Sequence, residues 1–254
     1  MDELRDQVRA GSPLAGTVLT LPGATAAELL ADPFDLVWID LEHAALGPLD
    51  AQEMILGAQA AGTFALVRLP AGAHALMATM LDAGADGVVL ADVTSAEVAR
   101  AAISRASHPP DGTRGWGPRR LSLRQRNAGR RPARPSVWVQ IESAAGVAQI
   151  AAILQVPGVD AAVVGTADLS FALGVPLDLH APGLLAAVHT VRQACAAAGT
   201  AFGLAGPLHT APEALWSGAS ILVHSTDARL CAEAVDGAAT WMRTRLASQP
   251  DGTT

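Results

Sequence analysis

The amino-acid sequence predicts an α/β protein built as a single (β/α)8 TIM barrel. Three observations carry this prediction: strand-like apolar runs alternate with helical patterns eight times, the connections between them are short, and the chain has 254 residues. Alternating units of this kind favour parallel strands, and one such barrel needs about 250 residues. A doubly wound open sheet is the alternative, weakened because no G-x-G-x-x-G turn follows the first expected strand.

Each strand is expected where a short apolar run is bounded by turn residues or polar side chains. The expected strands are Gly16–Leu21, Asp35–Leu41, Phe64–Leu69, Gly87–Ala91, Val137–Glu142, Ala161–Gly165, Thr200–Ala205 and Ser220–His224. The helices follow the apolar period of 3.6 residues, with start and stop signals such as a serine, threonine or glycine at their ends. The expected helices are Ala26–Ala31, Leu49–Ala61, Ala73–Ala83, Ser95–Ala106, Gly146–Gln155, Pro182–Ala198, Ala211–Ser217 and Ala228–Leu246.

Composition and charge narrow the class of protein. Half of the residues are hydrophobic and only 4% are aromatic, so the core is expected to consist mainly of Ala, Leu and Val. We expect a single domain over residues 1–247, followed by a disordered tail over residues 248–254. The formal net charge of −7 argues against a nucleic-acid partner. The charged amino terminus and the lack of a long apolar run predict a cytoplasmic protein with no membrane partner.

The chain contains no lysine, because all 17 of its basic residues are arginine. An enzyme that activates a carbonyl group through a Schiff base needs a lysine amine. Any enolate chemistry in this chain must therefore stabilise the anion in another way, most simply with a metal ion.

The stretch Asp35–Ala44, D-L-V-W-I-D-L-E-H-A, is an apolar run that ends in two acids and a histidine. Side chains alternate along a strand, so Asp40 and Glu42 project to one side while His43 lies where the strand gives way to a loop. This pattern suits the general-base corner of an active site. A strand end with solvated charges is the structural alternative, and this stretch alone does not decide between them.

Four expected strands end in polar groups, and active groups of a TIM barrel lie at the carboxyl ends of its strands. The groups are Glu42-His43, Arg68, Gln140 with Glu142, and the turn Thr166-Ala167-Asp168. Asp168 could simply cap a short helix. Together with Glu142, however, it offers two carboxylates that suit Mg²⁺ or Mn²⁺ and leave positions open for a chelating 2-keto acid.

The segment from Pro109 to Pro135 interrupts the regular alternation and holds eight arginines. A long solvated loop is one interpretation, and a lid or subunit contact that helps to hold an anionic substrate is the other. Arg114 is the member expected to face the site, because its flanking glycines allow a close approach of the backbone.

Several motifs together resemble the HpcH/HpaI aldolase family, the class II pyruvate aldolases. They are I-D-L-E-H-A, L-V-R-L-P, L-D-A-G-A-D-G, P-P-D-G-T-R-G, V-Q-I-E-S and G-T-A-D-L-S-F-A-L-G, and the likeness runs from about Gly16 to about Asp227. The resemblance implies a TIM barrel in a homo-oligomer, a hexamer arranged as a trimer of dimers with an exchanged terminal helix. It also implies a divalent metal, Mg²⁺ or Mn²⁺ with Co²⁺ as a further option, that binds pyruvate and its enolate.

The resemblance also implies roles for individual residues. It implies that Glu142 and Asp168 bind the metal, that His43 is the base with Asp40 as its orienting partner, and that Arg68 steadies the enolate oxygen. The residues implied for substrate binding are Gln140, Thr166, Ala167 and, in a neighbouring subunit's site, Asp82.

The function expected from this resemblance is a carbon–carbon lyase that cleaves or forms 4-hydroxy-2-keto acids from pyruvate or oxaloacetate and an aldehyde. One alternative is a lyase that acts on a coenzyme A thioester, in which the arginine-rich segment would grip phosphates. Another is a decarboxylase or carbon–carbon bond former that makes its enolate from oxaloacetate. A non-catalytic barrel is disfavoured because His43, Arg68, Glu142 and Asp168 are all present.

Overall fold

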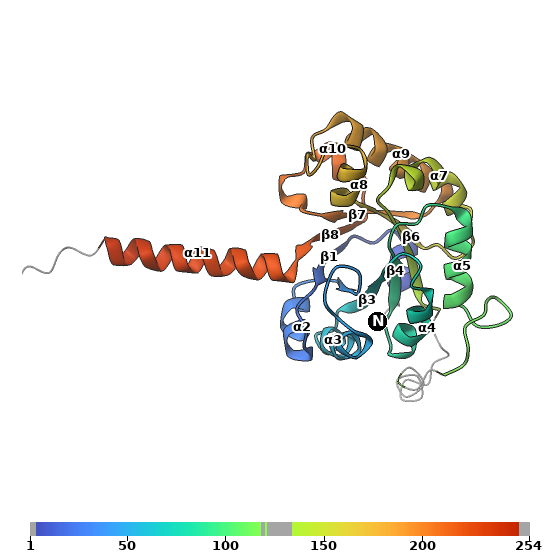
Figure 1. The fold of residues 1–254 in the computed structure, drawn as a ribbon, viewed down its shortest axis with the longest axis horizontal. Coiled ribbons are helices and arrows are strands. Elements are labelled where there is room, and N and C mark those ends of the chain that lie inside the picture. Colours follow the sequence, from blue (N-terminus) through green and yellow to red (C-terminus); the bar gives the residue numbers. More distant parts are fainter. Residues whose placement is uncertain (1–3, 118–119, 121–133, 249–254) are drawn as a thin grey trace, which may run out of the picture.

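The computed structural model describes residues 4–117, 120 and 134–248. Its strands are parallel and pair in sequence order, and β1 also pairs with β8, so the sheet closes into a barrel (Figure 1). The strands are β1 (Leu14–Leu19), β2 (Leu36–Asp40), β3 (Phe64–Leu69), β4 (Gly87–Leu90), β5 (Ser136–Ile141), β6 (Ala161–Gly165), β7 (Ala201–Gly206) and β8 (Ile221–Thr226). Closure excludes the open sheet and confirms the predicted TIM barrel.

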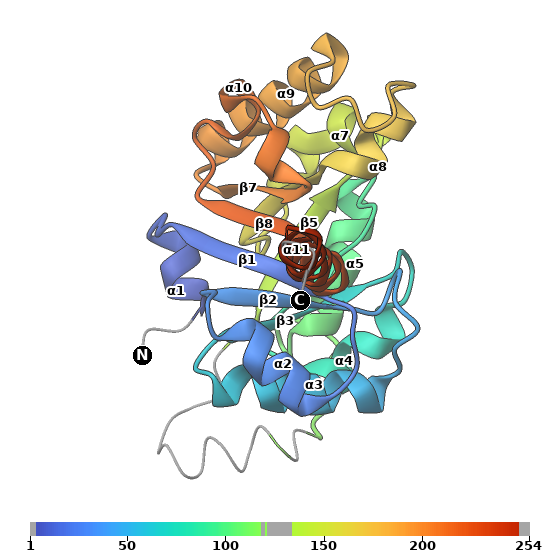
Figure 2. The ribbon, with the colours of Figure 1, turned by 90° about the vertical axis from the view of Figure 1, so that its left-hand side faces the viewer.

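The helices surround the barrel, except for the last one (Figures 1 and 2). They are α1 (Leu4–Arg9), α2 (Ala24–Ala31), α3 (Pro48–Ala60), α4 (His74–Asp82), α5 (Ala96–Ala106), α7 (Ala144–Leu154), α8 (Thr166–Ala172), α9 (Pro182–Ala198), the 3₁₀ turn η1 (Leu208–Thr210), α10 (Glu213–Trp216) and α11 (Asp227–Ala247). Ser95 and Ser143 cap α5 and α7 by accepting a backbone N–H of the first turn, and Gly199 ends α9 in the left-handed conformation.

Alternation along the strands divides the core into two layers. In β5, Val137, Val139 and Ile141 pack outward against the helices, whereas Trp138 points into the barrel, as the sequence predicts. The rings of Trp138 and Trp38 meet edge to face inside the barrel, with their centroids 6.1 Å apart. The filled interior leaves the carboxyl ends of the strands as the place for a site.

The first strand is shifted from its expected bounds: it starts at Leu14 and ends at Leu19 rather than at Leu21. The backbone N–H groups of Thr20 and Leu21 donate instead to the buried carboxylate of Asp227, at 2.8 and 3.0 Å. This contact joins residues about 207 positions apart, so no local pattern indicates where the strand ends.

The short helix α1 is absent from the sequence-based expectation. It is held by tertiary contacts, because Leu4 and Val8 pack into the inner core cluster and Arg5 donates to Asp160 at 2.9 Å. A helix of this length is too short to be stable by itself, which explains why its sequence carries little helical signal.

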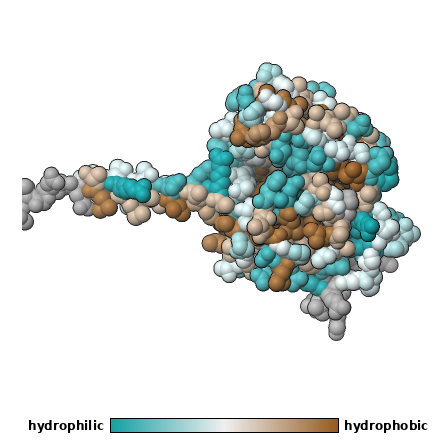
Figure 3. Space-filling model, in the orientation of Figure 1, coloured by the Kyte–Doolittle hydropathy of each residue, from teal (hydrophilic) through white to brown (hydrophobic). Residues whose placement is uncertain are grey.

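The last helix, α11, projects away from the barrel (Figures 1 and 2). It has 21 residues, a length of about 30 Å, and Asp227 is its only buried residue. Apolar side chains lie exposed along it, namely Val235, Trp241, Met242 and Leu246 (Figure 3). None of the helices in the described ranges has both the length and the apolar character needed to cross a membrane. The expected disordered tail lies outside the described residues, apart from Ser248.

Candidate active site

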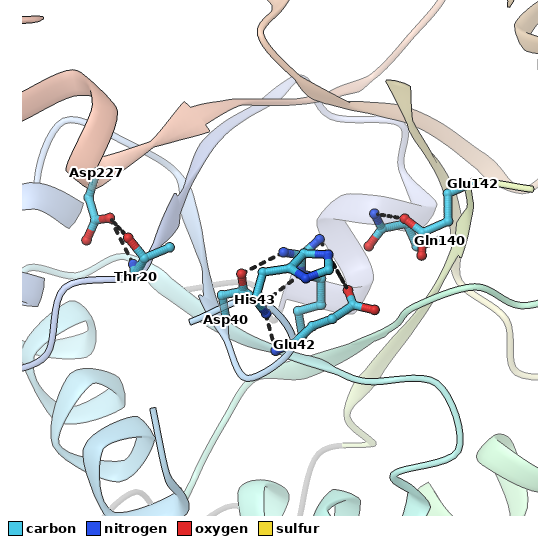
Figure 4. Close-up of polar contacts among 8 residues, drawn as sticks. Thr20, Asp40, Glu42, His43, Gln140, Glu142 and Asp227 are labelled. Atoms are coloured by element: carbon cyan, nitrogen blue, oxygen red, sulfur yellow. Dashed lines mark hydrogen bonds and ion pairs between the residues drawn. The ribbon is translucent and has the colours of Figure 1, made fainter. Parts of the chain in front are cut away.

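Polar side chains from separate strands meet at the carboxyl end of the barrel. They surround a cavity of about 230 Å³ whose lining includes His43, Arg68, Gln140, Ala167 and Asp168. All five were singled out from the sequence, because each follows or ends a predicted strand. Figure 4 shows Asp40, Glu42 and His43 on one side of the barrel opening and Gln140 with Glu142 on another.

Arg68 and Asp40 form a buried ion pair between neighbouring strands. The guanidinium donates from Nε to Oδ1 of Asp40 at 2.9 Å and from Nη2 to Oδ2 at 2.6 Å. Burial alone raises the pKa of Asp40, but the hydrogen bonds and charge of Arg68 outweigh it and hold the pKa below its usual value. The same contacts raise the pKa of Arg68 against the effect of burial, so both groups are charged.

Asp40 contacts His43 through the backbone rather than through the imidazole. Its Oδ1 accepts from the backbone N–H groups of Glu42 and His43, at 2.9 and 3.4 Å. The imidazole Nε2 lies 3.7 Å from Oε2 of Glu42, which in turn lies 3.4 Å from Nη1 of Arg68. Glu42 is therefore the carboxylate beside the imidazole, and Asp40 fixes the turn that carries it.

Glu142 is anchored by both oxygens and carries a perturbed pKa. Oε1 accepts from the backbone N–H of Asp92 at 2.7 Å, and Oε2 accepts from Nε2 of Gln140 at 2.5 Å. Burial, followed by the negative charge of Glu42, raises the pKa of Glu142 to about 7, and Asp168 adds to this effect. Three carboxylates thus lie within electrostatic reach of one another.

This excess of negative charge fits a bound divalent cation. Oε1 of Gln140 is buried without a hydrogen-bond partner, an unusual state for a polar atom, whereas Oε2 of Glu42 has only ion-pair contacts with Arg68 and His43. Across the described ranges, no group of three or more His, Cys, Asp or Glu side chains has metal-binding geometry. Two carboxylates suffice for a hard cation such as Mg²⁺, because it keeps several waters and takes further oxygen ligands from its substrate.

Gly165, at the end of β6, makes room for this arrangement. A Cβ atom at this position would lie 2.6 Å from Nε2 of Gln140 and 2.7 Å from Oε2 of Glu142. Only glycine therefore allows these two side chains to occupy their observed places.

Comparison with known proteins places this arrangement in a family. The model of the HpcH/HpaI aldolase/citrate lyase family matches residues 19–234. The chain belongs to this family.

Relatives of this HpcH/HpaI family member carry aldolase names. It is 31% identical over 246 residues, 92% of this chain and 93% of the relative, to a 4-hydroxy-2-oxovalerate aldolase from Rhodococcus jostii. It is 36% identical over 181 residues, 68% of this chain and 67% of the relative, to a 4-hydroxy-4-methyl-2-oxoglutarate aldolase from Chaetomium globosum. The prediction of a carbon–carbon lyase is thereby confirmed at the level of enzyme class.

A solved structure agrees with the sequence relatives. The crystal structure of an HpcH/HpaI aldolase/citrate lyase family protein from Burkholderia cenocepacia superposes with a TM-score of 0.86 at 31% identity. The match covers 96% of this chain and all of that chain.

Two predicted binding residues of this family member lie apart from the cavity. Asp82 ends α4 a few residues before β4 begins, at the amino-terminal end of the barrel, and Arg114 is buried in an ion pair with it. Neither side chain lines the cavity of its own chain. A role for Asp82 in a neighbouring subunit's site stays a prediction. Residues 118–119 and 121–133 of the arginine-rich segment lie outside the described residues.

Sequence reasoning missed part of one wall of the cavity. Ser225, Thr226 and Arg229 line it from β8 and the start of α11, next to Gly206 of β7, which the sequence places near the rim without a role. The signal was present as S-T-D-A-R directly after the eighth strand, which repeats the pattern of polar groups at a strand end. The same residues also match the start of a helix, with Thr226 as its cap, so this pattern alone does not distinguish a site from a helix end.

Proposed function

We propose that this family member is a divalent-metal-dependent aldolase that makes or uses a pyruvate-type enolate. It cleaves or forms 4-hydroxy-2-keto acids with an aldehyde as the second product or substrate. The observation that carries the proposal is a single cavity in which Arg68, Gln140 and Asp168 converge next to the anchored carboxylate of Glu142. Relatives named as aldolases of 2-oxo acids support the same reaction class.

The metal is assigned to the carboxylates of Glu142 and Asp168. Mg²⁺ or Mn²⁺ suits these oxygen ligands, with Co²⁺ as a further option. When bound, the cation acts as a Lewis acid that stabilises the negative charge of the enolate, a contribution of several kcal/mol. This role matches a chain without lysine, which has no side-chain amine for a Schiff base.

The residues around the metal site have separate tasks. His43 is more than half exposed toward the cavity and takes or returns the proton at the carbon next to the keto group, which contributes roughly 10²- to 10⁴-fold to the rate. Arg68, fixed in place by Asp40, donates to the enolate oxygen. Gln140 and the backbone at Thr166 and Ala167 hold the keto acid.

Asp40 acts on His43 indirectly in this scheme. It positions the turn through two backbone N–H groups, while Glu42 is the carboxylate that lies beside the imidazole, at 3.7 Å. The roles expected from the resemblance are thus divided between the two acids.

The protein is further proposed to work as a homo-oligomer, a hexamer arranged as a trimer of dimers, in which subunits exchange α11. Support comes from the exposed apolar side chains of Trp241, Met242 and Leu246 on a helix that leaves its own barrel. Apolar surface of this kind is normally covered by a partner. A cytoplasmic location stays a prediction.

A direct test mixes the protein with pyruvate and a panel of aldehydes, with and without a chelator, and identifies the products by mass. Adducts that form only in the presence of metal are expected. Adducts that form equally well with chelator would contradict the proposal. Cleavage of malyl coenzyme A, or release of pyruvate from oxaloacetate without an aldehyde, would favour one of the two related lyase reactions.

A further inference from the structure

The cavity carries a second arginine for which the proposed reaction has no role. Arg229, in the first turn of α11, lines the cavity together with Gly206 and Ser225. Arg68 enters the same cavity from β3. In the closed order of eight strands, β7 lies across from β3 and β8 lies across from β4. The two arginines therefore face the cavity from opposite walls.

The wall of the cavity that carries Arg229 holds none of the groups that are proposed to bind the keto acid. The groups assigned to the keto acid and its metal come from β3, β5 and the turn after β6, namely Arg68, Gln140, Glu142 and Asp168. An aldolase must also bind a second carbonyl compound, the acceptor of the new carbon–carbon bond. The wall formed by β7, β8 and the start of α11 holds none of the groups assigned to the keto acid, and it carries Arg229, so it offers a place for this second compound.

Arg229 has donors available for an anion. Its Nε donates to Oε1 of Glu233 at 2.9 Å, and both side chains are more than half exposed. Exposed pairs four residues apart on a helix are weak, so this contact orients the guanidinium without neutralising it fully. Neither terminal amino group of Arg229 has a hydrogen-bond partner among the residues described. Together these amino groups form the planar fork that binds a carboxylate in a bidentate manner.

The backbone beneath Arg229 is fixed. Oγ1 of Thr226 accepts from the backbone N–H of Arg229 at 3.3 Å, which caps α11. Asp227 is buried, and its carboxylate accepts from Thr20, Leu21 and Ala228, so its charge is compensated by its own hydrogen bonds. The first turn of α11 is thus tied to the loop after β1 (Figure 4) and presents Arg229 from a rigid base.

The charge of Arg229 selects the acceptor. A planar guanidinium on this wall of the cavity favours a second carbonyl compound with a carboxylate of its own. We propose that Arg229 binds the carboxylate of the acceptor, so that the preferred acceptor is an aldehyde or ketone that carries a carboxylate. This inference rests on the proposed aldolase function and adds the class of its second substrate.

The test compares acceptors that differ only in this charge. Glyoxylate is paired with acetaldehyde and succinate semialdehyde with butanal, each with pyruvate and metal, in the wild type and in Arg229→Gln and Arg229→Lys. Arg229→Gln is expected to raise the KM of the anionic member relative to the neutral member by roughly 10- to 100-fold, the effect of losing a charged hydrogen-bond partner. Arg229→Lys keeps the charge but loses the fork, so an intermediate ratio is expected.

A matched control removes an arginine of similar exposure. Arg100 pairs weakly with Glu97 on the outer helix α5, and Arg100→Gln is expected to keep the wild-type KM ratio. A wild-type ratio in Arg229→Gln would overturn the inference, as would a raised KM for pyruvate with every acceptor. Metal-dependent exchange of pyruvate methyl protons in the wild type tests the proposed function separately. If that exchange occurs and Arg229→Gln keeps the wild-type ratio, only the inference about the acceptor fails.

Discussion

Glu142, the proposed metal ligand, shows at the scale of a single residue how burial changes the pKa of a carboxyl group. Its folded-state pKa is about 7 against a usual value of 4.5, so between these values the folded protein holds a proton that the unfolded chain has released. The free energy of unfolding therefore falls as the pH rises through this window, by about 3 kcal/mol at most. A cation that binds the ionised carboxylate of Glu142 would offset this loss of stability.

The corresponding prediction concerns thermal unfolding of the wild type and of Glu142→Gln, with chelator or with Mn²⁺, from about pH 5 to about pH 8. In chelator, the melting temperature of the wild type is expected to fall relative to that of the variant as the pH rises. Added Mn²⁺ is expected to stabilise the wild type more strongly as the pH rises, and to stabilise the variant only slightly. A metal effect that is the same at every pH would contradict this assignment.

Individual site residues could be predicted to the extent that strand alternation determines where they point. Period two places Gln140 and Glu142 on the inner face of the fifth strand, and the structure has them in contact. The pairing of Asp40 with Arg68 could not be predicted, because it depends on the register of two strands that brings residues 28 positions apart together. Which acid lies beside the imidazole of His43 also emerges only from the structure, because it depends on the conformation of the turn after β2, which places Glu42 there rather than Asp40.

At the scale of elements, the end of β6 is adapted to the site by one glycine. Gly165→Ala would place a methyl group within 2.7 Å of side-chain atoms of both Gln140 and Glu142, so one or both must move. We expect the affinity for Mn²⁺, measured by calorimetric titration, to fall roughly 10- to 100-fold, as for other changes that shift a metal ligand.

The control for this substitution is Gly183→Ala in α9, where an added Cβ meets no atom within 4 Å. This variant is expected to keep its metal affinity and to be as stable as the wild type or slightly more stable. If Gly165→Ala binds the metal as tightly as the wild type does, the assignment of Glu142 as a metal ligand is contradicted.

The bounds of elements were predictable where local signals decide them. Proline near the first residue and glycine after the last define α9, and its predicted and observed bounds are the same. The bounds of β1 and the presence of α1 depend on distant contacts. The strand β1 ends where the next backbone N–H groups donate to Asp227, and α1 packs against the inner core. Such contacts leave no periodic trace in the local sequence.

At the scale of the whole molecule, the alternation of strands and helices predicted the closed barrel. The family resemblance implied an exchanged terminal helix, but no apolar period in the sequence indicated that α11 would leave the barrel. This helix exposes Trp241, of which 63% is accessible, and Met242 beside it. Trp241→Ala is expected to shift the mass in sedimentation equilibrium toward the single subunit, because apolar contacts dominate stable interfaces. Asp236→Ala, which changes an exposed polar residue of the same helix, is the control and should keep the assembly. A wild type that sediments as a single subunit would contradict the exchange.

We infer that this chain forms an enolate of a 2-keto acid with the help of a metal held by Glu142 and Asp168. The most direct measurement follows the exchange of pyruvate methyl protons with deuterium in D₂O by proton NMR, without any aldehyde. Loss of the methyl signal is expected in the wild type with Mg²⁺ or Mn²⁺, and it should stop on addition of a chelator and be absent in Glu142→Gln. Exchange that continues in chelator, or at the wild-type rate in Glu142→Gln, would contradict the account.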